Sequence, residues 1–238
     1  MLRYRLLFLV FCSVGFAQAQ PGTDWVARWA ADQRAAHRGI IRVSMLEKTT
    51  MRFEYASGSR NMKVEEELSF TPAGDRIESR ILAMEVDTRV MPPETPEQRA
   101  RREQGREHFD PQREARRFAR PLSVFERLQG QGTPETAEVD GRPVVRISMT
   151  AMDPADPIPR LTAWFDSETA ALVQVRAFVG GQAGSAMTVF VRYVRVDGLD
   201  LPVRRYTEGS FSFRRREREF SSLVDVRADI SEHRVERE

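Results

Sequence analysis

The sequence predicts an α+β domain built on one strongly curved antiparallel sheet. Short segments with alternating apolar and polar residues recur along the chain, and turn sequences such as Asp140-Gly141 and Asp197-Gly198 separate them. Few helical segments interrupt the series. A single sheet of this kind needs cover on its concave side, and one helix before it and one within it are available for that role.

The first residues, MLRYRLLFLVFCSVGFAQAQ, have the pattern of a secretory signal peptide. Arg3 and Arg5 give a positive start, residues 6–11 form a short apolar run, and Ala17-Gln18-Ala19 fits the small-residue cleavage pattern. We expect cleavage after Ala19, so that residues 20–238 form a single exported, periplasmic domain. No later stretch is long and apolar enough for a transmembrane helix.

Removal of that leader changes the charge balance. The full chain has 37 Lys and Arg against 35 Asp and Glu, and the leader contains two arginines and no acid. The mature chain is therefore formally neutral, which removes the compositional support for a nucleic-acid partner. The only cysteine, Cys12, also lies in the leader. A disulfide, a thiolate nucleophile and a Cys metal ligand are thus excluded from the mature protein.

The mature chain starts with a predicted amphipathic helix over residues 24–37. Gly39 is the expected end, although the apolar pattern is also compatible with a helix that continues to Leu46. Apolar residues of the helix share one face: Trp25, Val26, Trp29 and Ala30. Alternation then predicts three strands, at residues 51–55, 62–70 and 77–86, with a turn at Pro72-Ala73-Gly74.

The composition changes over residues 94–120. This segment has eight arginines, six acids and almost no large apolar residue. It is predicted to be a polar, Arg/Glu-rich helical insertion or a loop that stays outside the core. Residues 121–128 then predict a short amphipathic helix with its apolar residues at Leu122, Val124, Phe125 and Leu128.

The second half of the chain predicts a series of hairpins. Alternating or apolar segments predict strands at residues 144–152, 161–165, 171–179, 187–196, 201–206, 210–213 and 220–229. Prolines make 153–159 a rigid loop, and residues 180–186 form another loop. Residues 229–238 are predicted to be a polar tail.

No local motif supplies a catalytic, metal or cofactor site. Asp166 and Glu168 could act as a paired-carboxylate site, but the sequence DSETA favours a hairpin turn in which Asp166 bonds the local backbone. His37, His108 and His233 are far apart, and neither an HExxH nor a G-x-S-x-G sequence is present. We therefore predict no catalytic residue, no metal ligand and no cofactor.

The strongest positive signal is a surplus of apolar residues on one face of the predicted strands. An ordinary core explains most of them, but a curved sheet with short helices has more concave surface than the helices fill. Methionines would suit an adaptable ligand cavity. The predicted lining residues are Met149, Trp164, Val173, Val175, Met187, Val189, Val191, Tyr193 and Phe213.

Several short stretches occur in an order that suggests a known family. They are the segment EVDGRPVV at residues 138–145, the hairpin WFDSET at 164–169, the segment from Tyr193 to Pro202, and Phe220-Ser221-Ser222. The chain resembles the outer-membrane lipoprotein-sorting superfamily, which includes the carrier LolA, its receptor LolB and the lipid-sensing regulator RseB. The resemblance implies an incomplete β-barrel with a helical lid over a hydrophobic cavity for acyl chains, and it implies no catalysis.

The leading hypothesis is a monomeric periplasmic protein, not an enzyme, that holds lipid acyl chains or the lipid moieties of lipoproteins. Release of such a ligand would require helix 24–37 or helix 121–128 to move off the sheet. The alternative is an RseB-like envelope interaction or lipid-sensing module without transport, with residues 94–120 as the arm that binds a protein partner. An envelope hydrolase ranks last, because no local motif supplies a nucleophile or a metal; it would need carboxylates that converge in a cleft.

Overall fold

We describe the protein from a computed structural model of the whole chain. The structure describes residues 21–56, 58–71, 77–92, 94–98, 115–180, 186–215 and 218–238. Side chains are described for these residues except 21–24, 131–132, 211–215 and 218–220. The predicted signal peptide, the turn at 72–74, residues 181–185 and 99–114 of the polar insertion lie outside the described residues.

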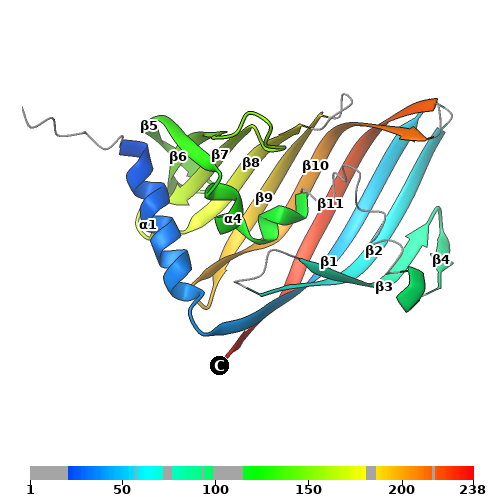
Figure 1. The fold of residues 1–238 in the computed structure, drawn as a ribbon, viewed down its shortest axis with the longest axis horizontal. Helices are drawn as coiled ribbons and strands as arrows, with labels where there is room; N and C mark the ends of the chain where they lie inside the picture. Colours follow the sequence, from blue (N-terminus) through cyan, green and yellow to red (C-terminus); the bar gives the residue numbers. More distant parts are fainter. Residues whose placement is uncertain are drawn as a thin grey trace, which may run out of the picture.

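The described part of the chain forms one open, curved antiparallel sheet of eleven strands, as Figure 1 shows. The spatial order is β4-β3-β2-β1-β11-β10-β9-β8-β7-β6-β5, so β4 and β5 are the edges. The strands are β1 Ile40–Tyr55, β2 Gly58–Phe70, β3 Glu78–Val86, β4 Arg89–Met91, β5 Leu128–Val139, β6 Arg142–Ala151, β7 Arg160–Asp166, β8 Leu172–Gly180, β9 Ala186–Val196, β10 Leu199–Arg215 and β11 Arg218–Arg237.

Helix α1 (Pro21–Ala36) ends near the position that the sequence predicts. Gly39 follows it with a φ of +71°, a left-handed conformation that glycine adopts without a Cβ clash and that ends many helices. Strand β1 begins at once, at Ile40. The alternative in which the helix continues to Leu46 is therefore wrong, because residues 40–46 pair with the end of the chain.

The predicted polar tail is a strand in this fold. Residues 230–237 belong to β11 and pair antiparallel with the start of β1, with Val43 opposite Val235. Ile230 is buried on the inner side of the sheet. The prediction of a tail was wrong because most residues of this segment are polar, and only pairing with a segment about 190 residues away makes it a strand.

The sequence also missed strand β5. Its residues include glycines and Pro134, which are unfavourable in a central strand. The strand lies at the sheet edge, where proline is tolerated because one side of the strand has no ladder to complete. A register irregularity between Gln131 and Glu135 brackets this proline.

The end of the polar insertion corrects another prediction. Residues 94–120 were expected to stay outside the core, yet Ala115, Phe118 and Ala119 are buried. Phe118 and Ala119 belong to a 3-10 turn, η2 (Arg117–Ala119). Helix α4 (Pro121–Phe125) follows and is shorter than the predicted 121–128. Pro121 occupies the first turn of α4, where its missing N–H is not needed.

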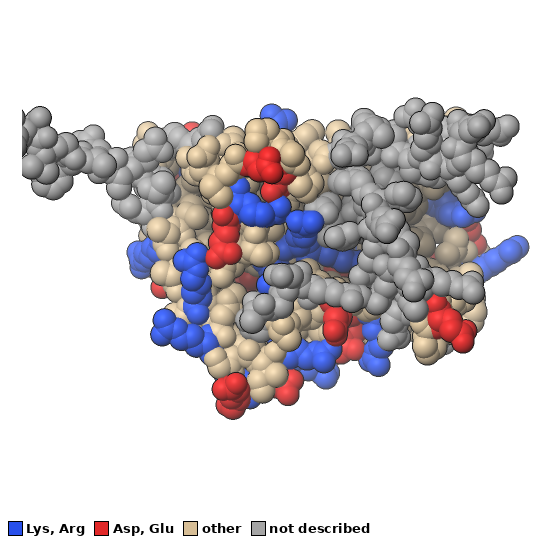
Figure 2. All heavy atoms as spheres, in the orientation of Figure 1, with Lys and Arg blue, Asp and Glu red and all other residues tan. Residues whose placement is uncertain are grey.

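The main core lies between the concave face of the sheet and these helical segments (Figure 1). Trp29 of α1, Phe118 of η2 and Phe125 of α4 pack against inward-facing residues of β6 to β9. A separate apolar cluster lies at the other end of the sheet, on β1, β2 and β11: Met51, Val64, Val224 and Val226. On the described part of the surface in Figure 2, side chains of both charge signs are interspersed.

Candidate functional site

Asp166 is the cap of a hairpin turn. Its Oδ1 accepts hydrogen bonds from the Thr169 N–H (2.7 Å), the Thr169 hydroxyl (2.7 Å) and the Glu168 N–H (3.1 Å), and Arg142 Nε donates to Oδ2 at 2.5 Å. Burial would raise the pKa of Asp166, but these hydrogen bonds outweigh burial and lower the pKa to about 2. The prediction of a turn is confirmed, since the oxygens of Asp166 are used locally.

The residues predicted to line a cavity lie mainly in the packed core. Six of them belong to the cluster that α1, η2 and α4 cover: Met149, Val175, Met187, Val189, Val191 and Tyr193. Tyr193 donates its hydroxyl to the Phe118 carbonyl at 3.0 Å, and burial raises its pKa well above 10. Their assignment to ligand binding stays a prediction.

The other three predicted residues have different positions. Val173 is buried at a β-bulge, because Trp164 pairs with Gln174 and Phe165 with Leu172. Trp164 is half-buried and alternates with the fully buried Phe165, so it points to the outer face. Phe213 lies in β10, and its side chain is outside the described residues.

Asp200 holds helix α1 on the sheet. This side chain is buried, and its Oδ2 accepts hydrogen bonds from Trp29 Nε1 at 2.8 Å and from the Leu172 N–H at 2.9 Å. Arg195 binds both carboxylate oxygens, at 2.8 and 2.9 Å. Gln33 completes the set, because its Oε1 accepts the Asp200 N–H at 3.0 Å. Side chains of α1 are thereby connected to β8, β9 and β10.

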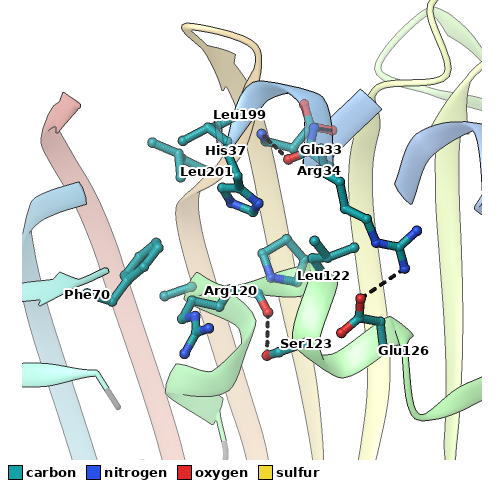
Figure 3. Close-up of a pocket in the computed structure, with 13 residues that line it drawn as sticks. Gln33, Arg34, His37, Phe70, Arg120, Leu122, Ser123, Glu126, Leu199 and Leu201 are labelled. Carbon is teal, nitrogen blue, oxygen red and sulfur yellow. Dashed lines mark hydrogen bonds and ion pairs between the residues drawn. The ribbon is translucent and has the colours of Figure 1, made fainter. Parts of the chain in front are cut away.

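A pocket of about 250 Å³ lies beside this network, between α1, α4 and the sheet (Figure 3). Apolar side chains form much of its lining: Phe70, Ala119, Pro121, Leu122, Leu199 and Leu201. Polar side chains come from the helical segments and β10: Gln33, Arg34, His37, Arg120, Ser123, Glu126 and Asp200. Apolar and polar residues thus contribute to the lining in nearly equal numbers, so the pocket is more polar than the mainly apolar lining usual for a small-molecule site.

The charged groups of the pocket are arranged around His37. Figure 3 shows Phe70 and Arg120 on one side and the ion pair between Arg34 and Glu126, 2.9 Å long, on the other. The Arg120 guanidinium lies 5.7 Å from the centre of the Phe70 ring, within the range of a cation–π contact. Burial and the nearby Arg120 lower the pKa of His37, so the imidazole is neutral at neutral pH.

The sequence did not identify this pocket, because its lining comes from segments far apart in the chain. The one available signal was the pair of predicted helices, 24–37 and 121–128, which were expected to cover the sheet and do border the pocket. Within the described residues, no group of three His, Cys, Asp or Glu side chains is placed to hold a metal ion. None of the described helices has the length and apolar character needed to cross a bilayer.

No protein-family model and no curated protein matches the chain. Solved structures do match. They include a DUF1329 family protein from Desulfovibrio piger (13% identity, TM-score 0.43, covering 91% of this chain and 94% of that one). An outer-membrane lipoprotein-sorting protein domain from Vibrio parahaemolyticus matches at 10% identity and TM-score 0.40, covering 87% and 91%. A LolA superfamily protein from Nitrosomonas europaea matches at 13% and 0.34, covering 92% and 95%.

Two of the three structures carry the name of the outer-membrane lipoprotein-sorting or LolA superfamily. Because the identities are 10–13% and the TM-scores are 0.34–0.43, the matches say nothing about what this chain binds.

Proposed function

We propose that this protein is an exported, non-enzymatic binding protein that holds a lipid acyl chain in the pocket between α1 and α4, with these two helices as a lid. The observation that carries the proposal is a partly apolar hollow bordered by two helical segments that pack on the concave face of an open sheet. Polar and charged side chains contribute the rest of its lining and could orient the polar end of a ligand.

The size of the pocket limits what it holds. A volume of about 250 Å³ is equivalent to roughly eight water-sized groups of about 30 Å³ each. This space suits a segment of one acyl chain. Burial of eight methylenes at about 0.8 kcal/mol each gives at most about 6 kcal/mol, which sets a lower bound on Kd on the order of tens of micromolar, because association itself has a free-energy cost. Tighter binding would require the helices to move apart and admit more of the chain.

A space-filling variant tests this proposal. Leu122→Trp adds bulk inside the pocket, whereas Leu223→Trp adds the same side chain at an exposed position of β11. We expect the first variant to weaken binding of a fluorescent fatty acyl probe at least 10-fold and the second to leave it unchanged. Native mass spectrometry of protein purified from an envelope fraction should detect bound lipid. Ligand-free wild-type protein that also fails to bind the probe would show that the proposal is wrong.

A further inference from the structure

His37 has its imidazole in the pocket between α1 and α4, as Figure 3 shows. It is the only histidine among the residues that line this pocket. Its backbone N–H donates to the Gln33 carbonyl at 2.9 Å, as in a last helical turn, so α1 fixes the position of the ring. Among the described residues, none forms a hydrogen bond with the ring nitrogens. A positive charge on the ring would therefore replace its contact with water by no hydrogen bond from the described part of the fold.

Charged groups from several elements face the His37 ring. Burial is the largest cause that lowers the pKa of His37, the Arg120 guanidinium lowers the pKa further, and the Glu126 carboxylate raises it. Glu126 is also paired with Arg34, 2.9 Å away, at the end of α1. On the sheet side, Asp200 of β10 is bound in the network that holds α1, and β2 contributes an uncharged aromatic ring. The closed pocket therefore keeps His37 neutral at neutral pH.

The proton affinity of His37 depends on whether water reaches the ring. The ordinary pKa of a histidine is 6.5, and the pKa of His37 in the closed pocket is lower. A state that exposes the ring to water therefore binds a proton more readily than the closed state does. The closed state has its full stability above pH 6.5 and loses stability as the pH falls below that value. The ratio of open to closed molecules then rises by up to about tenfold for each pH unit.

The contact that yields to this charge lies on the α4 side of the pocket. The middle of α1 is fixed by the buried hydrogen bond between Trp29 and Asp200. The end of α1 is joined to the end of α4 by the ion pair between Arg34 and Glu126, whose side chains are 58% and 49% exposed. An ion pair this exposed adds little stability, because water and salt screen it.

A positive charge on His37 repels the Arg120 guanidinium, which belongs to the residue before the first turn of α4. We propose that acid opens the pocket: protonation of His37 separates the first turn of α4 from the end of α1, and the pocket then loses affinity for its ligand. Opening is a property of the protein alone, and only the loss of ligand affinity rests on the proposed function. The pocket therefore binds its ligand above pH 6.5 and releases it in more acidic surroundings.

Hydrogen exchange of the α4 amides tests the opening without any ligand. Wild type is compared at the same pH with His37→Gln, whose side chain takes up no proton, and His37→Asn is a second neutral variant. At pH 5.5 the amides of residues 122–127 should exchange about three- to tenfold faster in wild type than in either variant, and at pH 7.5 all three proteins should match. His233→Gln is the matched control and should behave as wild type, because His233 of β11 is not among the pocket-lining residues. Equal exchange in wild type and His37→Gln at pH 5.5 would overturn the inference.

Ligand release is measured with the methyl ester of a fluorescent fatty acid, because the ester has no carboxyl group that titrates. Wild type should bind the ester about three- to tenfold more weakly at pH 5.5 than at pH 7.5, and His37→Gln should bind it equally at both. An equal loss of affinity in the two proteins would mean that other groups control release, and the inference would be wrong. Exchange that depends on His37, together with no binding of the ester at either pH, would support the acid-driven opening and refute the proposed function.

Discussion

Replacing Asp200 by alanine should loosen helix α1. The substitution removes the acceptor of the Trp29 indole N–H and of the Leu172 backbone N–H, both of which are buried. A buried donor left without a partner costs about 1–3 kcal/mol, so the two together cost about 2–6 kcal/mol. Arg195 contributes little to this sum because its side chain is 31% exposed and can reach water. The loss is a large part of the roughly 5–15 kcal/mol that stabilises a typical domain.

Thermal unfolding measures this effect directly. For a chain of this size, about 4 kcal/mol lowers the Tm by roughly 8–16 °C. Asp229→Ala is the matched control, because Asp229 pairs with Arg204 at 3.2 Å on the surface, where the two side chains are 78% and 74% exposed. Such a pair is worth less than about 1 kcal/mol, and its loss should lower the Tm by a few degrees at most.

Hydrogen exchange shows where Asp200→Ala acts. Amides of α1 should exchange faster, and the acyl probe should bind more weakly, because Gln33 and Arg34 of α1, and His37 just after it, line the pocket. Equal Tm values for Asp200→Ala and Asp229→Ala, with unchanged exchange in α1, would refute the reasoning. In that case apolar packing of Trp29 alone would hold the helix on the sheet.

Two further predictions concern turns and backbone. The pKa of Asp166 is about 2 in the fold and 3.8 ordinarily, so the unfolded chain binds more protons than the fold between these pH values. The stability of the fold therefore falls as the pH drops from about 4 to 2. Asp166→Asn should show a smaller fall in Tm over that range. Gly209→Ala should lower the free energy of unfolding in urea by about 1–3 kcal/mol from backbone strain alone, because φ is +152°. The steric clash adds to this loss, because the new Cβ would lie 2.2 Å from the Ala186 carbonyl oxygen. A Tm profile for Asp166→Asn identical to wild type, or a wild-type urea midpoint for Gly209→Ala, would contradict the respective prediction.

Most local structure followed from residue patterns within a few positions. Alternation placed β2, β3 and the central hairpins, and Asp-Gly pairs placed two turns, because these features depend on neighbouring residues. The apolar face with Trp29 placed α1, and DSETA was identified as a turn although it contains two carboxylates. The sequence also indicated that the sheet would need cover on one side.

Contacts between distant segments were decided only by the tertiary structure. Residues 40–46 and 230–237 are ambiguous separately and become strands by pairing with each other. Phe118 follows a long polar segment, yet it is buried in the main core, and its carbonyl accepts a hydrogen bond from Tyr193 of β9. The pocket combines residues from three or more segments of the chain. Local alternation determines on which face of the sheet a side chain lies. Only the complete set of strand pairings and helix contacts determines which other residues that side chain contacts.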